Sequence, residues 1–132
     1  MNDQIKKKIL IVDDDPEDVL LLKKILKPNY QVIEEHDGLY AMERVDREHP
    51  DLVLTDIMMP KKSGYSLCAY LKWNPNTKDI PVVMVTGLKA EINEDIGDCM
   101  GADGYLLKPV QVNKIHDLIS RLLNNNHQPT KC

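Results

Sequence analysis

The stretch Ile9–Pro16 reads ILIVDDDP, an uninterrupted apolar run followed by three carboxylates and a proline. A continuous run of Ile, Leu and Val is typical of a strand that is buried on both faces of a sheet. Asp15 before Pro16 is typical of a helix start, because an Asp side chain caps the first backbone N–H groups and proline suits the first helical turn. The stretch therefore predicts a central strand that leads directly into a helix.

Four more short apolar runs follow, at residues 31–33, 52–54, 82–85 and 105–107, and each is separated from the next by an amphipathic stretch. Helices are expected between Pro16 and Pro28 and over about 38–48, 64–73, 89–100 and 111–123. Strands that alternate with helices require right-handed crossovers and give a parallel sheet covered on both faces. We therefore predict a doubly wound α/β fold, with one domain over residues 1–124 and a polar, disordered tail over 125–132.

The composition narrows the class of protein. The chain has 132 residues, 42% of them apolar, and 17 Lys and Arg against 21 Asp and Glu give a net charge of −4. These values are typical of a soluble globular domain, and the acidic balance argues against direct contact with nucleic acid. No apolar run approaches the roughly 20 residues that cross a bilayer, and the start does not resemble a secretory signal. Cys68, Cys99 and Cys132 are widely spaced, so we expect reduced thiols in a cytoplasmic protein without membrane contact.

Carboxylates gather at the ends of two predicted strands. Asp13 and Asp14 follow the first strand, and Asp56 follows the third. Ligand sites in open α/β sheets lie at the carboxyl ends of the strands, so these side chains converge if the two strands are neighbours. Three close carboxylates repel one another unless a cation lies among them. Oxygen ligands with room for water favour Mg²⁺, with Mn²⁺ as the alternative.

A hydroxyl and an ammonium are expected at the same edge. Thr86 ends the fourth strand, and Lys108 follows the fifth. A lone Asp, Thr or Lys at such a position is usually a helix cap, a strand residue or a solvated side chain. Together they suit phosphoryl transfer to a carboxylate, because a metal and Lys108 would neutralise the phosphoryl oxygens while Thr86 donates a hydrogen bond to one of them.

With these residues in place, the chain resembles the receiver domain of two-component response regulators, the family that includes chemotaxis regulators. The resemblance runs from about Lys8 to Leu123 and rests on four segments: ILIVDDDPED (9–18), DLVLTDIMMP (51–60), IPVVMVTG (80–87) and GADGYLLKP (101–109). It implies a flavodoxin-like three-layer sandwich around a five-stranded parallel sheet in the order 2-1-3-4-5. It further implies two helices on one face, three on the other, and an output surface formed by the fourth helix, the fifth strand and the fifth helix.

The resemblance also implies roles for the residues that match the family's motifs. Asp56 matches the aspartate that accepts the phosphoryl group. Asp14 and Asp56 match direct metal ligands, Asp13 matches a ligand that acts through water, and Met58 matches the residue that lends its backbone carbonyl. Mg²⁺ is therefore the expected cofactor.

Further positions match the phosphate-binding and switching parts of the family. Thr86 and Lys108 match the phosphate-binding hydroxyl and lysine, and Tyr105 matches the aromatic switch residue. The bond before Pro109 matches one that is usually cis. The implied partners are a sensor histidine kinase or a histidine phosphotransfer protein as phosphoryl donor and a downstream protein that the sequence does not identify. We expect a monomer or weak dimer.

Three other classes of protein remain as alternatives to a signalling domain that is not an enzyme. A phosphatase with an aspartyl-phosphate intermediate typically carries a second carboxylate two residues after its nucleophile, where Met58 stands here. A binding module that is never phosphorylated usually lacks one of the acids or the lysine, and none is lacking. A flavin-binding protein should have a hydroxyl-rich loop after the first strand, where the carboxylates at 13–15 would repel its phosphate.

Overall fold

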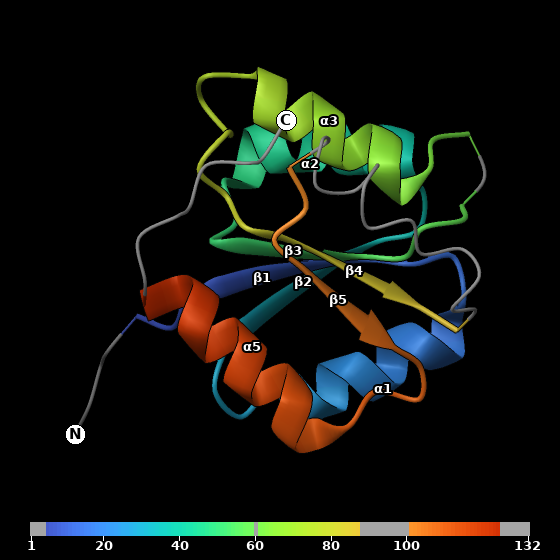
Figure 1. The fold of residues 1–132 in the computed structure, drawn as a ribbon, viewed down its shortest axis with the longest axis vertical. Helices are drawn as coiled ribbons and strands as arrows, with labels where there is room; N and C mark the ends of the chain where they lie inside the picture. The colour runs from blue at the N-terminus through green and yellow to red at the C-terminus, as the bar shows by residue number, and fades with distance from the viewer. Residues whose placement is uncertain (1–4, 60, 88–100, 125–132) are drawn as a thin grey trace.

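Five parallel strands form one sheet at the centre of the molecule (Figure 1). The computed structural model describes residues 5–59, 61–87 and 101–124. The strands are β1 (Lys8–Val12), β2 (Gln31–Glu35), β3 (Leu52–Thr55), β4 (Val82–Thr86) and β5 (Gly104–Leu107). Their order is β2-β1-β3-β4-β5, and all four neighbouring pairs are parallel. The predicted fold class and strand order are confirmed, and each predicted strand lies within an observed one.

The helices of the described residues form two outer layers (Figure 1). They are α1 (Pro16–Leu26), α2 (Gly38–Glu48), α3 (Gly64–Trp73) and α5 (Val112–Asn124). Helices α1 and α5 cover one face of the sheet, and α2 and α3 cover the other. The helix predicted over 89–100, and with it the predicted third helix on one face, lies outside the described residues. None of the described helices has the length and apolar character needed to span a bilayer.

Local side-chain caps explain where the first three helices begin. The Asp15 carboxylate accepts a hydrogen bond from the backbone N–H of Glu17, as its position before Pro16 predicts. Asp37 caps α2 and Ser63 caps α3 in the same way. Each cap accepts a hydrogen bond from one of the N–H groups that have no partner inside the helix at its start. The capping residue thereby fixes where the helix begins.

The strand β1 is buried on both faces, as its uninterrupted apolar run predicts. Ile9 and Ile11 belong to the core formed with α1 and α5, whereas Leu10 and Val12 belong to the core formed with α2 and α3. All four side chains are fully buried. Burial of each contributes about 1.5–3 kcal/mol relative to exposure. The central strand is therefore held firmly, and so is the turn that follows it.

Gly64 lies where helix α3 begins beside the loop after β3. A Cβ at Gly64 would lie 2.2 Å from the carbonyl oxygen of Asp56, whereas a Cβ at Gly87 would have only the Lys108 Cβ nearby, at 4.0 Å. Backbone atoms cannot move aside without displacing the loop. We therefore predict that Gly64→Ala lowers the free energy of unfolding by about 1–3 kcal/mol.

The matched control is Gly87→Ala, which should leave the free energy of unfolding unchanged or raise it by up to about 1 kcal/mol. Urea unfolding followed by circular dichroism measures both variants. Equal stability of the two would contradict the close approach of Gly64 to the backbone of Asp56.

Candidate functional site

Three carboxylates converge at the carboxyl ends of β1 and β3. Asp13, Asp14 and Asp56 each offer one oxygen, and these oxygens lie within 4.8 Å of one another. Val12 pairs with Thr55 in the sheet, and the N–H of Asp56 donates to the carbonyl of Val12 at 2.9 Å. The pairing of two parallel strands therefore places side chains from distant parts of the sequence in one cluster.

Backbone hydrogen bonds orient two of these carboxylates. The Oδ1 atom of Asp13 accepts from the N–H of Asp15 at 2.9 Å, and Oδ1 of Asp56 accepts from the N–H of Ile57 at 2.8 Å. Asp13 is buried, Asp56 is half-buried and Asp14 is exposed. With Oδ1 held by the turn in each case, the Oδ2 atoms of Asp13 and Asp56 face the ammonium of Lys108.

Lys108 supplies positive charge to the cluster. Its Nζ lies 2.7 Å from Oδ2 of Asp13, 2.7 Å from Oδ2 of Asp18 and 3.5 Å from Oδ2 of Asp56. Its backbone N–H donates to the carbonyl of Thr86 at 2.8 Å, and the peptide bond to Pro109 is cis. The end of β5 is thereby fixed beside the end of β4, with the lysine side chain directed across the sheet edge.

The environment raises the pKa of two groups, Asp56 and Lys108, for different reasons. Burial raises the pKa of Asp56 above its ordinary value, and attraction by Lys108 opposes the change while repulsion from Asp13 adds to it. Burial alone would lower the pKa of Lys108, but hydrogen bonds to Asp13 and Asp18 outweigh it and raise that pKa above its ordinary value. Lys108 is therefore positively charged at neutral pH, whereas ionisation of the Asp56 carboxyl is less favourable here than in water.

Both shifts contribute stability that is lost as pH rises, but over different ranges of pH. Asp56, with its raised pKa, stabilises the fold below the ordinary carboxyl pKa, and that contribution is lost as pH rises through the raised value. Lys108, also with a raised pKa, contributes stability that is fully present at neutral pH and is lost only as pH rises through its own raised pKa. Ionisation of Asp56 in the cluster without metal therefore carries a cost in stability, which the attraction of Lys108 partly offsets.

Two other predicted site residues lie on one face of the sheet. Thr86 is fully buried at the end of β4. It pairs with Leu107, and Met84 pairs with Tyr105, so Thr86 and Tyr105 project to the same face. That face is the one covered by α2 and α3, where the half-buried Tyr105 ring packs against the core. Met58, after β3, has a side chain that is 61% exposed.

Two residues beside the cluster are not identified by the sequence. Asp18, in the first turn of α1, contacts Lys108 as described. His36, after β2, has its Nδ1 3.3 Å from the carbonyl oxygen of Asp13 and its Nε2 3.5 Å from a carboxylate oxygen of Glu34. An acid in the first turn of a helix is normally explained by the helix dipole, so the sequence offers no signal that Asp18 has a distant partner.

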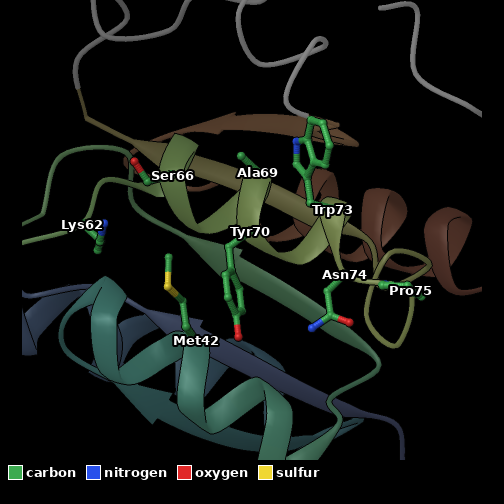
Figure 2. A pocket seen from close by; sticks show the side chains of 8 residues that line it. All are labelled: Met42, Lys62, Ser66, Ala69, Tyr70, Trp73, Asn74 and Pro75. Atoms are coloured by element: carbon green, nitrogen blue, oxygen red, sulfur yellow. The ribbon is translucent and has the colours of Figure 1, made fainter.

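A separate hollow lies between α2 and α3, on the outer surface of that layer (Figure 2). Its volume is about 620 Å³. The Trp73 side chain at its edge is 86% exposed, and the Tyr70 hydroxyl, which points toward α2, donates to Asp46 at 2.9 Å. Eight residues line it: Met42, Lys62, Ser66, Ala69, Tyr70, Trp73, Asn74 and Pro75. None belongs to the carboxylate cluster, so this hollow is not part of the site described above.

The chain matches one family model and several curated proteins. The family model of the response regulator receiver domain matches residues 9–120. The transcriptional regulatory protein CpxR of Escherichia coli is 39% identical over 121 residues, which cover 91% of this chain and 50% of CpxR. The chain spans about half the length, or less, of the first curated relatives that it matches.

Solved structures show the same fold. The signal receiver domain of a histidine kinase from Syntrophus aciditrophicus has a TM-score of 0.78 at 33% identity, and the match covers 89% of each chain. The receiver domain of a sensor histidine kinase from Pseudomonas aeruginosa, whose structure has a magnesium ion coordinated in its active site cleft, has a TM-score of 0.83 at 23% identity and covers 91% of this chain and 99% of that one. The family match over most of the chain, the curated relatives and the fold agree: this chain belongs to the response regulator receiver domains of two-component signalling.

Proposed function

We propose that the chain is a phosphorylation-controlled switch that accepts a phosphoryl group on Asp56 from a phosphohistidine. The observation that carries this proposal is the meeting of Asp13, Asp14 and Asp56 with the ammonium of Lys108 at one end of the sheet. A carboxylate nucleophile, acidic metal ligands and a fixed cation are the groups that phosphoryl transfer to a carboxylate needs.

The cluster fits a divalent cation with a preference for oxygen. Three carboxylate oxygens lie within 4.8 Å of one another, and the exposed Asp14 leaves room for water ligands. Asp13, Asp14 and Asp56, with the backbone carbonyl of Met58, would hold Mg²⁺, or Mn²⁺ in its place. When bound, the ion supplies positive charge that neutralises the transferring phosphoryl group.

The residues of the chain then have distinct roles. Oδ2 of Asp56, which faces Lys108, attacks phosphorus, and the phosphorus–nitrogen bond of the donor breaks with its electron pair left on the imidazole. Lys108 binds one phosphoryl oxygen through its ammonium, and the hydroxyl of Thr86 donates to another. The Oδ1 atom of Asp56 stays oriented by the N–H of Ile57 at 2.8 Å, so the carboxylate does not rotate as it is modified.

Signalling rather than catalysis is the proposed outcome. An aspartyl-phosphate phosphatase would place an acid two residues after Asp56, and Met58 offers no proton there. The phosphoryl donor would be a sensor histidine kinase or a histidine phosphotransfer protein in the cytoplasm, and the receiver domain would span residues 1–124. Downstream, a protein target would bind the surface that includes β5 and α5.

The first prediction from this proposed function concerns the acceptor. Incubation with Mg²⁺ and acetyl phosphate should add a single acid-labile phosphoryl group, because Asp56 is a half-buried carboxylate within reach of Lys108. Intact-mass spectrometry at neutral pH measures the added group. Asp56→Asn should take up none, and a stable phosphoryl group on that variant would show that the acceptor lies elsewhere.

The second prediction concerns the metal. Millimolar Mg²⁺ should raise the melting temperature by several degrees, since a ligand that binds the native state alone stabilises it and here also relieves repulsion. Asp14→Ala should lose most of this response while being no less stable than the parent without metal. Asp117→Ala, which removes an exposed carboxylate from α5, is the control that should keep the full response. No response in the parent would argue that the cluster does not bind metal.

The third prediction concerns transmission of the signal. The phosphoryl mimic beryllofluoride should shift amide resonances of residues 101–108, because Thr86 and Tyr105 share one face of neighbouring strands and the Thr86 hydroxyl would turn to the phosphoryl oxygens. In Thr86→Ala, binding should persist but the shifts around Tyr105 should shrink. Thr77→Ala, another fully buried threonine, placed in the loop before β4, is the matched control. Identical shifts in Thr86→Ala and the parent would contradict the switch.

A further inference from the structure

Lys108 has an acidic partner that does not belong to the metal cluster. Oδ2 of Asp18 accepts a hydrogen bond from its Nζ at 2.7 Å, as short as the bond to Asp13 and shorter than the 3.5 Å to Asp56. The Asp18 side chain is 32% exposed, and the Lys108 side chain is 18% exposed. The ammonium is thus held between the cluster and helix α1.

The start of helix α1 does not itself require Asp18. The Asp15 side chain caps the helix by accepting from the N–H of Glu17 at 2.9 Å. Glu17, in the same first turn, provides negative charge near the positive end of the helix dipole. Asp18 is the acid of this turn whose carboxylate reaches Lys108 at the end of β5. The Asp18 carboxylate therefore links helix α1 to Lys108 at the edge of the sheet and is not needed to cap the helix.

The bond to Asp18 competes with the proposed phosphoryl group. An ammonium has three N–H donors, and in this structure Asp13 and Asp18 take the two short bonds. A phosphoryl group on Asp56 brings about −1.5 to −2 charges and three acceptor oxygens. A phosphoryl oxygen can take the third N–H, but the added negative charge draws Lys108 toward Asp56 and away from Asp18, while the Asp18 carboxylate repels the new charge.

We propose that Asp18 is a positioning residue that restrains Lys108 in the unphosphorylated protein and thereby weakens capture of the phosphoryl group. This inference rests on the proposed role of Asp56 as acceptor and adds a regulator of that same site. It makes the first turn of α1 sensitive to phosphorylation, because the Asp18–Lys108 bond and the Lys108–phosphoryl bond oppose each other. Removing the Asp18 charge should release the ammonium to Asp56.

Beryllofluoride binding at saturating Mg²⁺ tests the inference, with amide resonances as the readout. Asp18→Asn keeps the shape of the side chain and removes its charge, and its Kd should fall about three- to fivefold, the size of effect that one partly exposed ion pair supports. Glu17→Gln removes a charge from the same helical turn without touching Lys108 and should stay within about twofold of the parent. Asp18→Glu restores the charge and should return Kd toward the parent value.

The direction of the change separates this role from a structural one. If Asp18 merely supported the fold or held Lys108 in its working position, Asp18→Asn would bind beryllofluoride more weakly, and that result overturns the inference. Equal effects of Asp18→Asn and Glu17→Gln would also overturn it, because the effect would then be one of general charge. Asp18→Ala is a second variant in which the bond is removed entirely, and it should also tighten binding.

Failure of the proposed function would look different. A parent protein that binds no beryllofluoride at saturating Mg²⁺ and takes no phosphoryl group from acetyl phosphate would refute Asp56 as acceptor, and the inference about Asp18 would fall with it. A parent that does both, combined with an unchanged Kd in Asp18→Asn, would refute the restraint alone and leave the acceptor role intact.

Discussion

The repulsion among Asp13, Asp14 and Asp56, offset in part by the ammonium of Lys108, is the interaction on which the rest of the site depends. The parallel pairing of β1 with β3 forces two of these carboxylates together, because Val12 and Thr55 are opposite each other and the next residue along each strand carries the acid. The two-sided burial of β1 supplies the stability that such a charged cluster needs. The carboxylates of the site consequently repel one another, and added positive charge would relieve that repulsion.

Residues whose position follows from the chain's local pattern could be predicted from the sequence. The apolar run before Asp13 predicted the central strand, Asp15 with Pro16 predicted the helix start, and both are confirmed. Convergence of the carboxylates followed from strand order, since the ends of neighbouring parallel strands share one edge. The strand and the helix start depend on local periodicity and capping, which the sequence expresses directly, whereas the strand order was implied by the family resemblance.

Contacts that depend on the direction of long side chains could not be predicted from the sequence. The Asp18–Lys108 bond depends on where α1 crosses the sheet edge and on how a flexible lysine is directed, and neither has a local sequence signal. Hydropathy is equally uninformative about Trp73, an aromatic residue at a helix end that lies 86% exposed at the edge of the hollow between α2 and α3 (Figure 2) rather than in the core. The helix predicted over 89–100 lies outside the described residues.

The alternation of side chains along the strands gives the proposed phosphoryl group access to both faces of the sheet. Thr86 and Tyr105 project toward the layer of α2 and α3, because Met84, which pairs with Tyr105 and lies two residues before Thr86, belongs to the core on that face. Leu106 packs on the opposite face with α1 and α5, and Lys108, two residues later, reaches Asp18 of α1. A single new charge at Asp56 would therefore pull on a hydroxyl from one face and an ammonium from the other. Movement of the Thr86 hydroxyl would leave space for Tyr105, and movement of the Lys108 ammonium would weaken its bond to Asp18. The free energy of phosphorylation would therefore be divided between the Tyr105 side of the sheet and helix α1.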